Sequence, residues 1–248
     1  MRELLFVCCT PGRKEDTVVM RSLSKLGAQQ TVFFEKVSVR FASCYNYVLK
    51  SLTQNNPIVV FVRDDVLIGD LFIQEKLNQA MDVLGFAVVG VAGGAVFTFD
   101  ENQPVTAWNQ VPPAQLSGAV EYSGVGLQNT WRSYGAAPAR CITLDNPLLA
   151  VDPKKIGALR FDERFETYFL ELDFCLSAHF SGLFLGTTNV YVNRKPETLP
   201  ADPHFIAAQN MFRAKWRTRM QQQSQKTQSA RQALSLEQAS PGQQPAQG

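Results

Sequence analysis

Histidine is almost absent from this chain, and the chain also lacks Cys-x-x-Cys pairs, long apolar runs and the pattern of a signal peptide. The chain has two histidines in 248 residues, and its five cysteines form no Cys-x-x-Cys pair, so a zinc site of the usual kind is not expected. No apolar run reaches membrane-spanning length. Charges at Arg2 and Glu3 precede only a short apolar run, so we expect no signal peptide. The cysteines mostly sit within apolar runs, which predicts free thiols in a reducing cytoplasm.

Net positive charge is absent from the chain except near its end. The segment after Asp202 carries six basic residues and one acid, a net charge of +5, which leaves −3 for the preceding body. A slightly acidic body lacks the basic face of a nucleic-acid-binding domain, so we expect no nucleic acid partner. Residues 221–248 hold ten glutamines together with Ser, Ala and Pro. This composition has little to bury and predicts a disordered tail.

Short apolar runs alternate with helical patterns through the first 94 residues. The runs predict strands at residues 4–9, 31–34, 58–62 and 87–92. The helical patterns between them lie at residues 16–26, 42–52 and 70–84. Asp16 and Asp70 are the predicted N-caps, and Gly27 and Gly85 the predicted stops. The alternation predicts an α/β fold: one domain over residues 1–202 with a mostly parallel central sheet flanked by helices.

The pattern loosens between about residues 95 and 140, where Gly, Pro and Trp accumulate and loops with antiparallel strands are expected. Beyond it we predict a strand at residues 141–151 and a helix that begins near Glu171 and ends at Gly182. A last strand or hairpin is predicted at residues 183–192.

An amphipathic basic helix is predicted at residues 203–220. Its apolar positions recur at helical spacing on one face: Phe205, Ala208, Phe212, Trp216 and Met220. In one interpretation this face packs onto the domain and leaves Arg213, Arg217 and Arg219 exposed. In the other, the helix meets anionic lipid and holds the protein at the membrane surface.

Two acidic clusters are candidates for chemistry. The strand at residues 58–62 ends in Asp64 and Asp65, and ligands of parallel α/β sheets bind beyond the carboxyl ends of the strands. A polar turn closing the strand is the alternative. The second cluster comprises Asp162, Glu163, Glu171 and Asp173. One of its carboxylates would act as a general base, or these acids simply favour a helix start.

The order of several short motifs makes the chain similar to a known family. They are Ser43-Cys44-Tyr45-Asn46, Arg63-Asp64-Asp65-Val66, Gly90-Val91-Ala92-Gly93, Leu144-Asp145-Asn146, Phe161-Asp162-Glu163 and Glu171-Leu172-Asp173-Phe174. On these motifs, and over about residues 3–195, the chain resembles the family 2 type glycosyltransferases of GT-A (Rossmann-like) fold. Among them it is most similar to the glycosyltransferase-like group named for a streptomycin-biosynthesis protein. The resemblance implies an inverting transfer of a sugar from a nucleotide-diphosphate sugar.

The resemblance also implies roles for individual residues. Asp65 matches the usual ligand of Mn²⁺ or Mg²⁺, and His204 is a second candidate ligand. Glu171 takes the position of the catalytic base, with Asp173 beside it. Candidates for nucleotide binding are Thr10, Arg13, Glu35, Asn46, Arg63 and Asp64. Candidates for the sugar and acceptor side are Trp108, Asp145, Asp162 and Glu163.

Two departures from the family leave two functions open. Arg63 stands where relatives carry the first aspartate of an Asp-x-Asp triplet, and Glu171 stands where inverting relatives carry an aspartate. The first function is a cytoplasmic glycosyltransferase in surface polysaccharide or glycoconjugate assembly, with a glycan or lipid-linked acceptor and peripheral contact at the inner membrane. The second is a catalytically weak or inactive GT-A-like binding or scaffold module.

Overall fold

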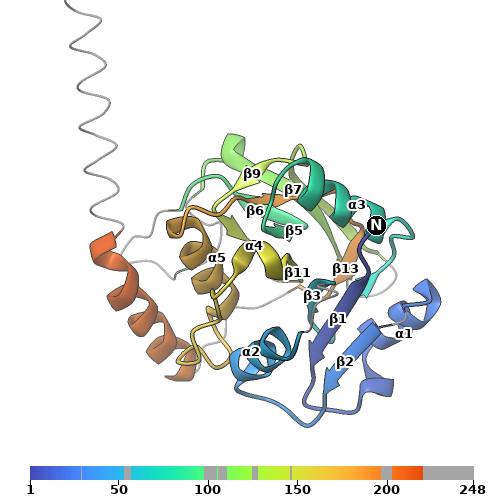
Figure 1. The fold of residues 1–248 in the computed structure, drawn as a ribbon. Coiled ribbons are helices and arrows are strands. Elements are labelled where there is room, and N and C mark those ends of the chain that lie inside the picture. Colours follow the sequence, from blue (N-terminus) through green and yellow to red (C-terminus); the bar gives the residue numbers. More distant parts are fainter. Residues whose placement is uncertain are drawn as a thin grey trace, which may run out of the picture.

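The computed structural model describes residues 1–28, 30–52, 57–97, 105, 111–124, 128–145, 147–196 and 203–219 (Figure 1). The chain has an α/β fold with two mixed β-sheets and covering helices. Trp108 and the glutamine-rich segment 221–248 lie outside the described residues.

The main sheet has seven strands in the order β2-β1-β3-β11-β5-β12-β9. Their bounds are β1 Leu4–Cys9, β2 Gln30–Phe34, β3 Ile58–Val62, β5 Val88–Gly90, β9 Arg140–Cys141, β11 Leu148–Val151 and β12 Leu185–Thr187. β1 is parallel to β2 and β3, and β12 is parallel to β5, but β11 runs antiparallel between β3 and β5. β9 is also antiparallel to its neighbour β12. The sheet is therefore mixed, where the sequence predicted a mostly parallel one.

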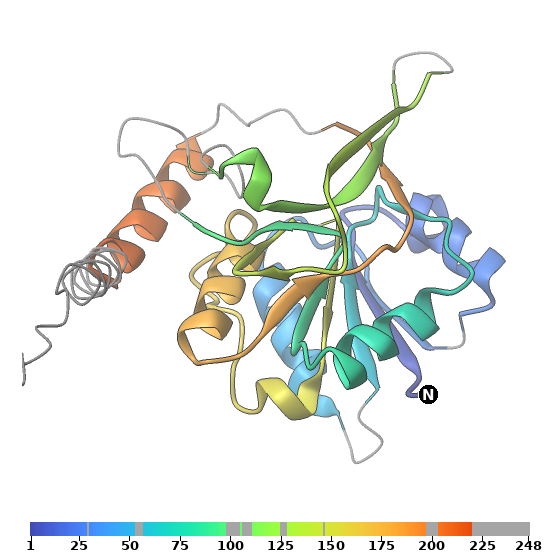
Figure 2. The same cartoon turned by 90° about the horizontal axis from the view of Figure 1, so that it is seen from above.

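The second sheet has the order β10-β6-β7-β13-β4, with β8 paired to β7. Its strands are β4 Leu67–Ile68, β6 Ala92–Gly94, β7 Leu116–Tyr122, β8 Thr130–Gly135, β10 Thr143–Leu144 and β13 Val192–Arg194. The β7–β8 pair extends away from the main sheet (Figure 2) and supplies the antiparallel strands expected before residue 140.

Two predictions about the later strands are confirmed only in part. Residues 141–151 form parts of three short strands, β9, β10 and β11, because the chain passes from one sheet to the other and back. Residues 183–192 form no hairpin, since β12 belongs to the main sheet and β13 to the second.

The helices lie close to their predicted positions. They are α1 Val18–Leu26, α2 Phe41–Ser51, α3 Ile73–Asn78, α4 Pro153–Ile156 and α5 Leu170–Phe180, with a further helix at residues 203–219. Single turns η1 (Lys14–Asp16), η2 (Gln79–Val83) and η3 (Pro113–Gln115) complete the set. Thr17, not Asp16, caps α1, because its side chain accepts the N–H of Met20 at 3.2 Å. Gly27 ends α1 in the left-handed region, at φ 66°.

The main sheet is packed on both faces, and each strand sends alternate residues to opposite sides. Phe6 and Cys8 of β1 join a core with α1 and α3, whereas Val7 and Cys9 join a core with α2, α5 and the helix at 203–219. Figure 2 shows these helices on either side of the sheet. Two-sided burial explains why β3 is an unbroken apolar run, with every residue buried.

The helix at residues 203–219 completes the second of these cores. Phe212 and Trp216 are fully buried, and Trp216 stacks on Phe180 with ring centroids 5.4 Å apart. The prediction that this helix packs its apolar side onto the domain is confirmed. Arg217 and Arg219 are exposed as predicted, but Arg213 is half-buried. No helix among the described residues is both long and apolar enough to cross a membrane.

Replacing Trp216 tests the contribution of this helix. Trp216→Ala should lower the free energy of unfolding by about 3–5 kcal/mol, because it leaves a large cavity under the helix. Urea denaturation followed by circular dichroism measures the change as a lower midpoint. Thr218→Ala, at an exposed position of the same helix, should stay within about 0.5 kcal/mol of wild type. Equal midpoints for the two variants would contradict the packing.

Candidate functional site

Asp64 and Asp65 follow the carboxyl end of β3, which lies in the interior of the main sheet between β1 and β11. This confirms their predicted place in the fold. The hydroxyl of Thr10, directly after β1, donates a 2.9 Å hydrogen bond to Oδ2 of Asp64. The carbonyl of Asp64 accepts the N–H of Val18, the first residue of α1, at 3.0 Å. The ends of β1, β3 and the start of α1 are thus tied together at one edge.

Arg63 and Asp65 form an ion pair within this strand end. Nε of Arg63 lies 3.1 Å from Oδ1 of Asp65, and the two side chains are 35% and 24% exposed. The carboxylate that the resemblance assigns to a metal ion therefore has a cation beside it. A guanidinium is also a good partner for phosphate, so Arg63 can bind either anion.

Glu35 and Arg13, two of the residues predicted for the nucleotide side, lie along the same edge. Glu35 follows β2, and its carboxylate accepts the N–H of Lys14 at 2.9 Å. Arg13 is exposed at the start of η1. Because β2, β1 and β3 are parallel neighbours, the segments that leave their carboxyl ends are adjacent.

Glu171 approaches this edge from α5, where it is 9% exposed. The pKa of the buried Tyr45 hydroxyl is raised well above its usual range, first by burial and then by negative charge that includes Glu171, while Arg63 opposes the rise. Burial is also the main cause of the raised pKa of Cys9, to which Glu171 contributes. Glu171 and Arg63 therefore both lie close enough to the buried Tyr45 for their charges to act on its hydroxyl.

The strand-end acids act on the neighbouring thiol. The pKa of Cys8 is raised by burial first, and then by the negative charges of Asp64 and Asp65. Cys8 and Cys9 are the last two residues of β1. Glu171 and the strand-end acids, about 100 residues apart in the sequence, thus both act on the cysteines at the end of this strand. All five cysteines are free thiols, as predicted.

Asn46 joins two of the family motifs to each other. Its amide Nδ2 donates to the carbonyl of Phe161 and to Glu163, both at 2.9 Å, and its Oδ1 accepts the N–H of Phe161 at 2.9 Å. Glu163 also accepts the hydroxyl of Ser43 at 3.0 Å. Both amide protons of Asn46 are used in this way, so its side chain holds the segment 161–163 against α2.

Asp162 and Asp173 share one lysine of the C-terminal helix. Nζ of Lys215 lies 2.8 Å from Oδ2 of Asp162 and 2.7 Å from Oδ1 of Asp173. Asp173 is 1% exposed and also accepts the indole N–H of Trp216 at 2.8 Å. These contacts fix the helix at 203–219 to the start of α5. The structure thus gives both carboxylates, predicted as candidates for chemistry, a clear structural task.

The two carboxylates have pKa values displaced in opposite directions. Hydrogen bonds from Arg164 and then Lys215 hold the pKa of Asp162 well below its usual range. Burial raises the pKa of Asp173, and Lys215 and Trp216 only partly offset it. As pH falls, Asp173 therefore takes up a proton before Asp162 does.

Asp145 belongs to the second sheet rather than to the strand-end group. It follows β10, and its carboxylate lies 3.6 Å from Nη1 of Arg194, which is 1% exposed on β13. Its charge contributes to the raised pKa of Tyr122, for which burial is the largest cause. Its predicted contact with sugar or acceptor stays a prediction.

The donor set for a metal ion is small. His204 is exposed in the first turns of the helix at 203–219. Among the residues that the structure describes, no three His, Cys, Asp or Glu side chains gather where they could hold a metal ion. Mg²⁺ is commonly bound by one or two carboxylates together with substrate phosphates, and Asp64 and Asp65 fit that pattern.

Sequence reasoning missed three residues that shape the site. In the sequence, Lys215 is only one charge of the predicted basic helix, and Tyr45 is only one member of a short motif. Arg194 has no feature that marks it. Nothing local marks Lys215 or Arg194 as buried partners, because their carboxylates lie 42 to 53 and 49 residues away in the sequence. Tyr45 sits in an apolar stretch of α2, and that position was the available signal.

Comparison with known proteins gives no family assignment. No family model matches the chain, and no curated protein matches it. Among solved structures, the chain is similar to the crystal structure of A197 from STIV, with a TM-score of 0.44 and 11% sequence identity. That match covers 82% of this chain and 98% of A197.

The pKa of Asp162 predicts a pH-dependent contribution to stability. A depressed native pKa stabilises the fold above the unfolded-state value of about 3.9, and this contribution is lost as pH falls below it. Asp162→Asn should therefore lower the free energy of unfolding at pH 7 by on the order of 1 kcal/mol, and the difference from wild type should shrink below about pH 4. Urea titrations across this pH range measure it.

Asp16→Asn serves as the control, because Asp16 is exposed on η1. It should follow wild type at every pH. A loss for Asp162→Asn that is the same at pH 7 and pH 3 would show that the carboxylate charge is not responsible.

Proposed function

We propose that this chain is a nucleotide-sugar-dependent glycosyltransferase of GT-A fold, inverting at the anomeric carbon, with a glycan or glycoconjugate acceptor. One observation carries the proposal: the charges of Glu171 from α5 and Arg63 after β3 both act on the buried Tyr45, and those of Asp64 and Asp65 act on Cys8 at the end of the neighbouring strand β1. A general base and an anion-binding strand end within one small region are what sugar transfer requires.

The donor would lie along the carboxyl edge of β1, β2 and β3. Arg13 and Glu35 are exposed there and suit the polar groups of a nucleoside. The guanidinium of Arg63 would bind the diphosphate by charge-assisted hydrogen bonds, exchanging part of its contact with Asp65. Asp65, with Asp64, would hold Mn²⁺ or Mg²⁺, which when bound neutralises charge on the leaving diphosphate.

The acceptor step falls to Glu171. Its carboxylate would remove the proton of the attacking hydroxyl as that oxygen forms the new bond to the anomeric carbon and the nucleoside diphosphate departs. Its low exposure supports this role, because a carboxylate shielded from water is a stronger base toward a bound hydroxyl. Asn46 and Lys215 serve as positioning residues, since they fix the segment 161–163 and the first turn of α5 around Glu171.

A binding module without transfer activity is the second candidate. The ion pair between Arg63 and Asp65 favours it, because an internal cation satisfies the carboxylate that a metal ion would otherwise neutralise. Such a module would bind a nucleoside diphosphate through Arg63 with no need of a divalent ion, and would turn nothing over. Metal dependence and turnover therefore separate the two candidates.

Asp65→Ala tests the donor site. It should abolish the Mn²⁺-dependent part of nucleoside diphosphate binding while leaving the fold intact, because Asp65 lies in the turn after β3 and outside both cores. Calorimetric titration of a panel of nucleoside diphosphates, with and without Mn²⁺, measures the effect. Glu15→Ala is the control, at an exposed acid of η1. Binding that is equally strong in Asp65→Ala and wild type would refute the site.

Glu171→Gln tests the catalytic base. It should keep the affinity for the donor and lower turnover by at least ~100-fold, as expected when a general base is lost. Glu166→Gln makes the same change at an exposed position just before α5 and should leave turnover intact. The release of nucleoside diphosphate with acceptor present measures the rate. Comparable turnover in Glu171→Gln and wild type would exclude Glu171 and point to Asp162 or Asp173.

A further inference from the structure

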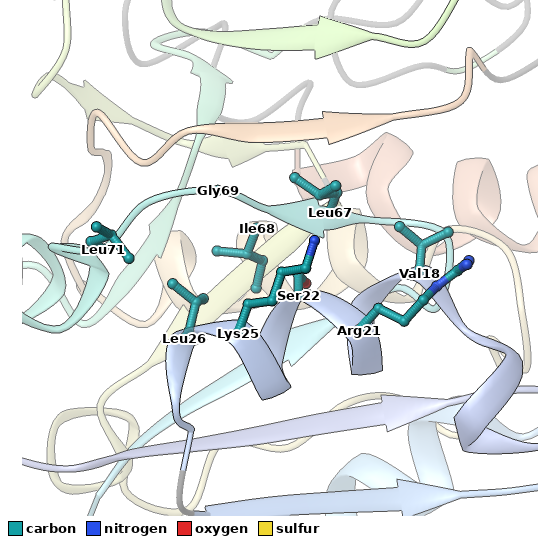
Figure 3. A pocket seen from close by; sticks show the side chains of 9 residues that line it. All are labelled: Val18, Arg21, Ser22, Lys25, Leu26, Leu67, Ile68, Gly69 and Leu71. Carbon is teal, nitrogen blue, oxygen red and sulfur yellow. The ribbon is translucent and has the colours of Figure 1, made fainter.

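A groove runs between α1 and β4, beside the strand-end acids. It encloses about 610 Å³, a size typical of sites for small organic ligands. Figure 3 shows its walls, which are mainly apolar and come from both elements: Val18, Leu26, Leu67, Ile68 and Leu71. An apolar channel of this size suits the hydrocarbon part of a ligand.

Positive charge borders this apolar channel. Arg21 and Lys25 stand one turn apart on α1 and line the groove; Lys25 rises toward Leu67 of β4, and Arg21 points toward Val18 (Figure 3). No carboxylate is among the lining residues. Within the part of the chain that the structure describes, neither cation forms an ion pair. The groove therefore combines a hydrocarbon surface with two cations that lack a counter-charge, which is complementary to an anionic amphiphile.

One end of the groove adjoins the candidate site. Val18 lines that end, and its N–H donates to the carbonyl of Asp64 at 3.0 Å. The β4 wall begins two residues after Asp65. Leu26 and Leu71 lie at the other end (Figure 3), where Leu71 is 76% exposed. An apolar chain in the groove would thus run away from the strand-end acids, with its polar end directed toward them.

We propose that this groove binds a lipid phosphate, a single hydrocarbon chain that ends in a phosphate group. The chain would lie between α1 and β4, and the phosphate would be bound by Arg21 and Lys25, whose donors form charge-assisted hydrogen bonds with phosphate oxygens. The binding of this ligand is independent of the transferase activity. Only its use as the acceptor rests on the proposed function.

The charge distribution favours a lipid phosphate over other occupants. A neutral detergent-like chain would leave both cations unpaired, and inorganic phosphate would leave the apolar walls exposed to water. A second copy of the chain would have to bring an acidic, apolar segment to the groove. The experiment below separates these occupants.

Calorimetric titration of the full chain with monomeric dodecyl phosphate tests the proposal, with dodecyl maltoside and inorganic phosphate as comparison ligands. Wild type should bind dodecyl phosphate at one site, at least about tenfold more tightly than either comparison ligand. The double variant Arg21→Glu with Lys25→Glu should lose at least about tenfold in affinity. Leu71→Asp, at an exposed position of the apolar wall, should also weaken binding.

A matched charge control is available on the other side of the main sheet. Lys50→Glu with Lys154→Glu changes the net charge by the same amount, at exposed positions of α2 and α4. It should bind dodecyl phosphate like wild type, and circular dichroism should show all variants folded. A loss of affinity in this control equal to that of the α1 variant would assign the effect to net charge and overturn the site.

Three other results would overturn the proposal. They are the absence of saturable binding by wild type, equal affinity for dodecyl maltoside, and unchanged affinity in the α1 double variant. A change of oligomeric state in that variant, with lipid affinity unchanged, would assign the groove to contact between copies. The titration contains no nucleotide, so it measures lipid binding separately from sugar transfer. If the chain binds the lipid but shows no transferase activity, the proposed function is refuted and the groove assignment stands.

Discussion

Burial of the main sheet on both faces is the constraint on which the rest of this structure depends. β3 lies inside the sheet with helices on either side, and all five of its residues are buried, so no polar side chain fits along its length. Charged groups can appear only where the strand leaves the sheet, and Arg63, Asp64 and Asp65 appear there at once. The same holds for the polar residue Thr10, which follows the largely buried strand β1. The polar edge that forms the candidate site is thus a consequence of the apolar interior.

The internal cation at this edge shapes its chemistry. Arg63 beside Asp65 reduces the net charge of the strand end to −1, where the two adjacent carboxylates alone would carry −2 and repel each other. In the proposed function, a diphosphate would bring negative charge and draw the guanidinium, which would free the carboxylate for a cation. Donor and metal ion would then bind in a coupled way, each improving the site for the other. Arg63, in place of the aspartate of the glycosyltransferases that the sequence resembles, would therefore alter how the proposed site is assembled.

The sequence predicted those features of the fold that depend on local pattern. β1, β3, α1 and α2 were placed to within two residues, because apolar runs and helical spacing reflect burial directly. The direction of β11 could not be predicted, since an apolar run reads the same whichever way the strand runs. The N-cap of α1 is Thr17 and not the predicted Asp16. Both residue types can cap a helix, and the tertiary structure determines which of them does. In the candidate site, the sequence predicted only the acids and the residues of the short motifs. It did not predict the groove or the ion-pair partners Lys215 and Arg194, because these depend on contacts between distant segments.

The contacts of Asp173 have a consequence for the order of synthesis. Asp173 enters the core with α5, but Lys215 and Trp216, the groups that compensate its burial, lie 42 and 43 residues further along the chain. An uncompensated buried carboxylate is strongly unfavourable, so a nascent chain that has only reached the end of α5 cannot complete this core. The last described helix must leave the ribosome first. Until then the surface of α5 that the helix covers stays open to chaperones, and the domain becomes competent only after nearly all of it has been translated.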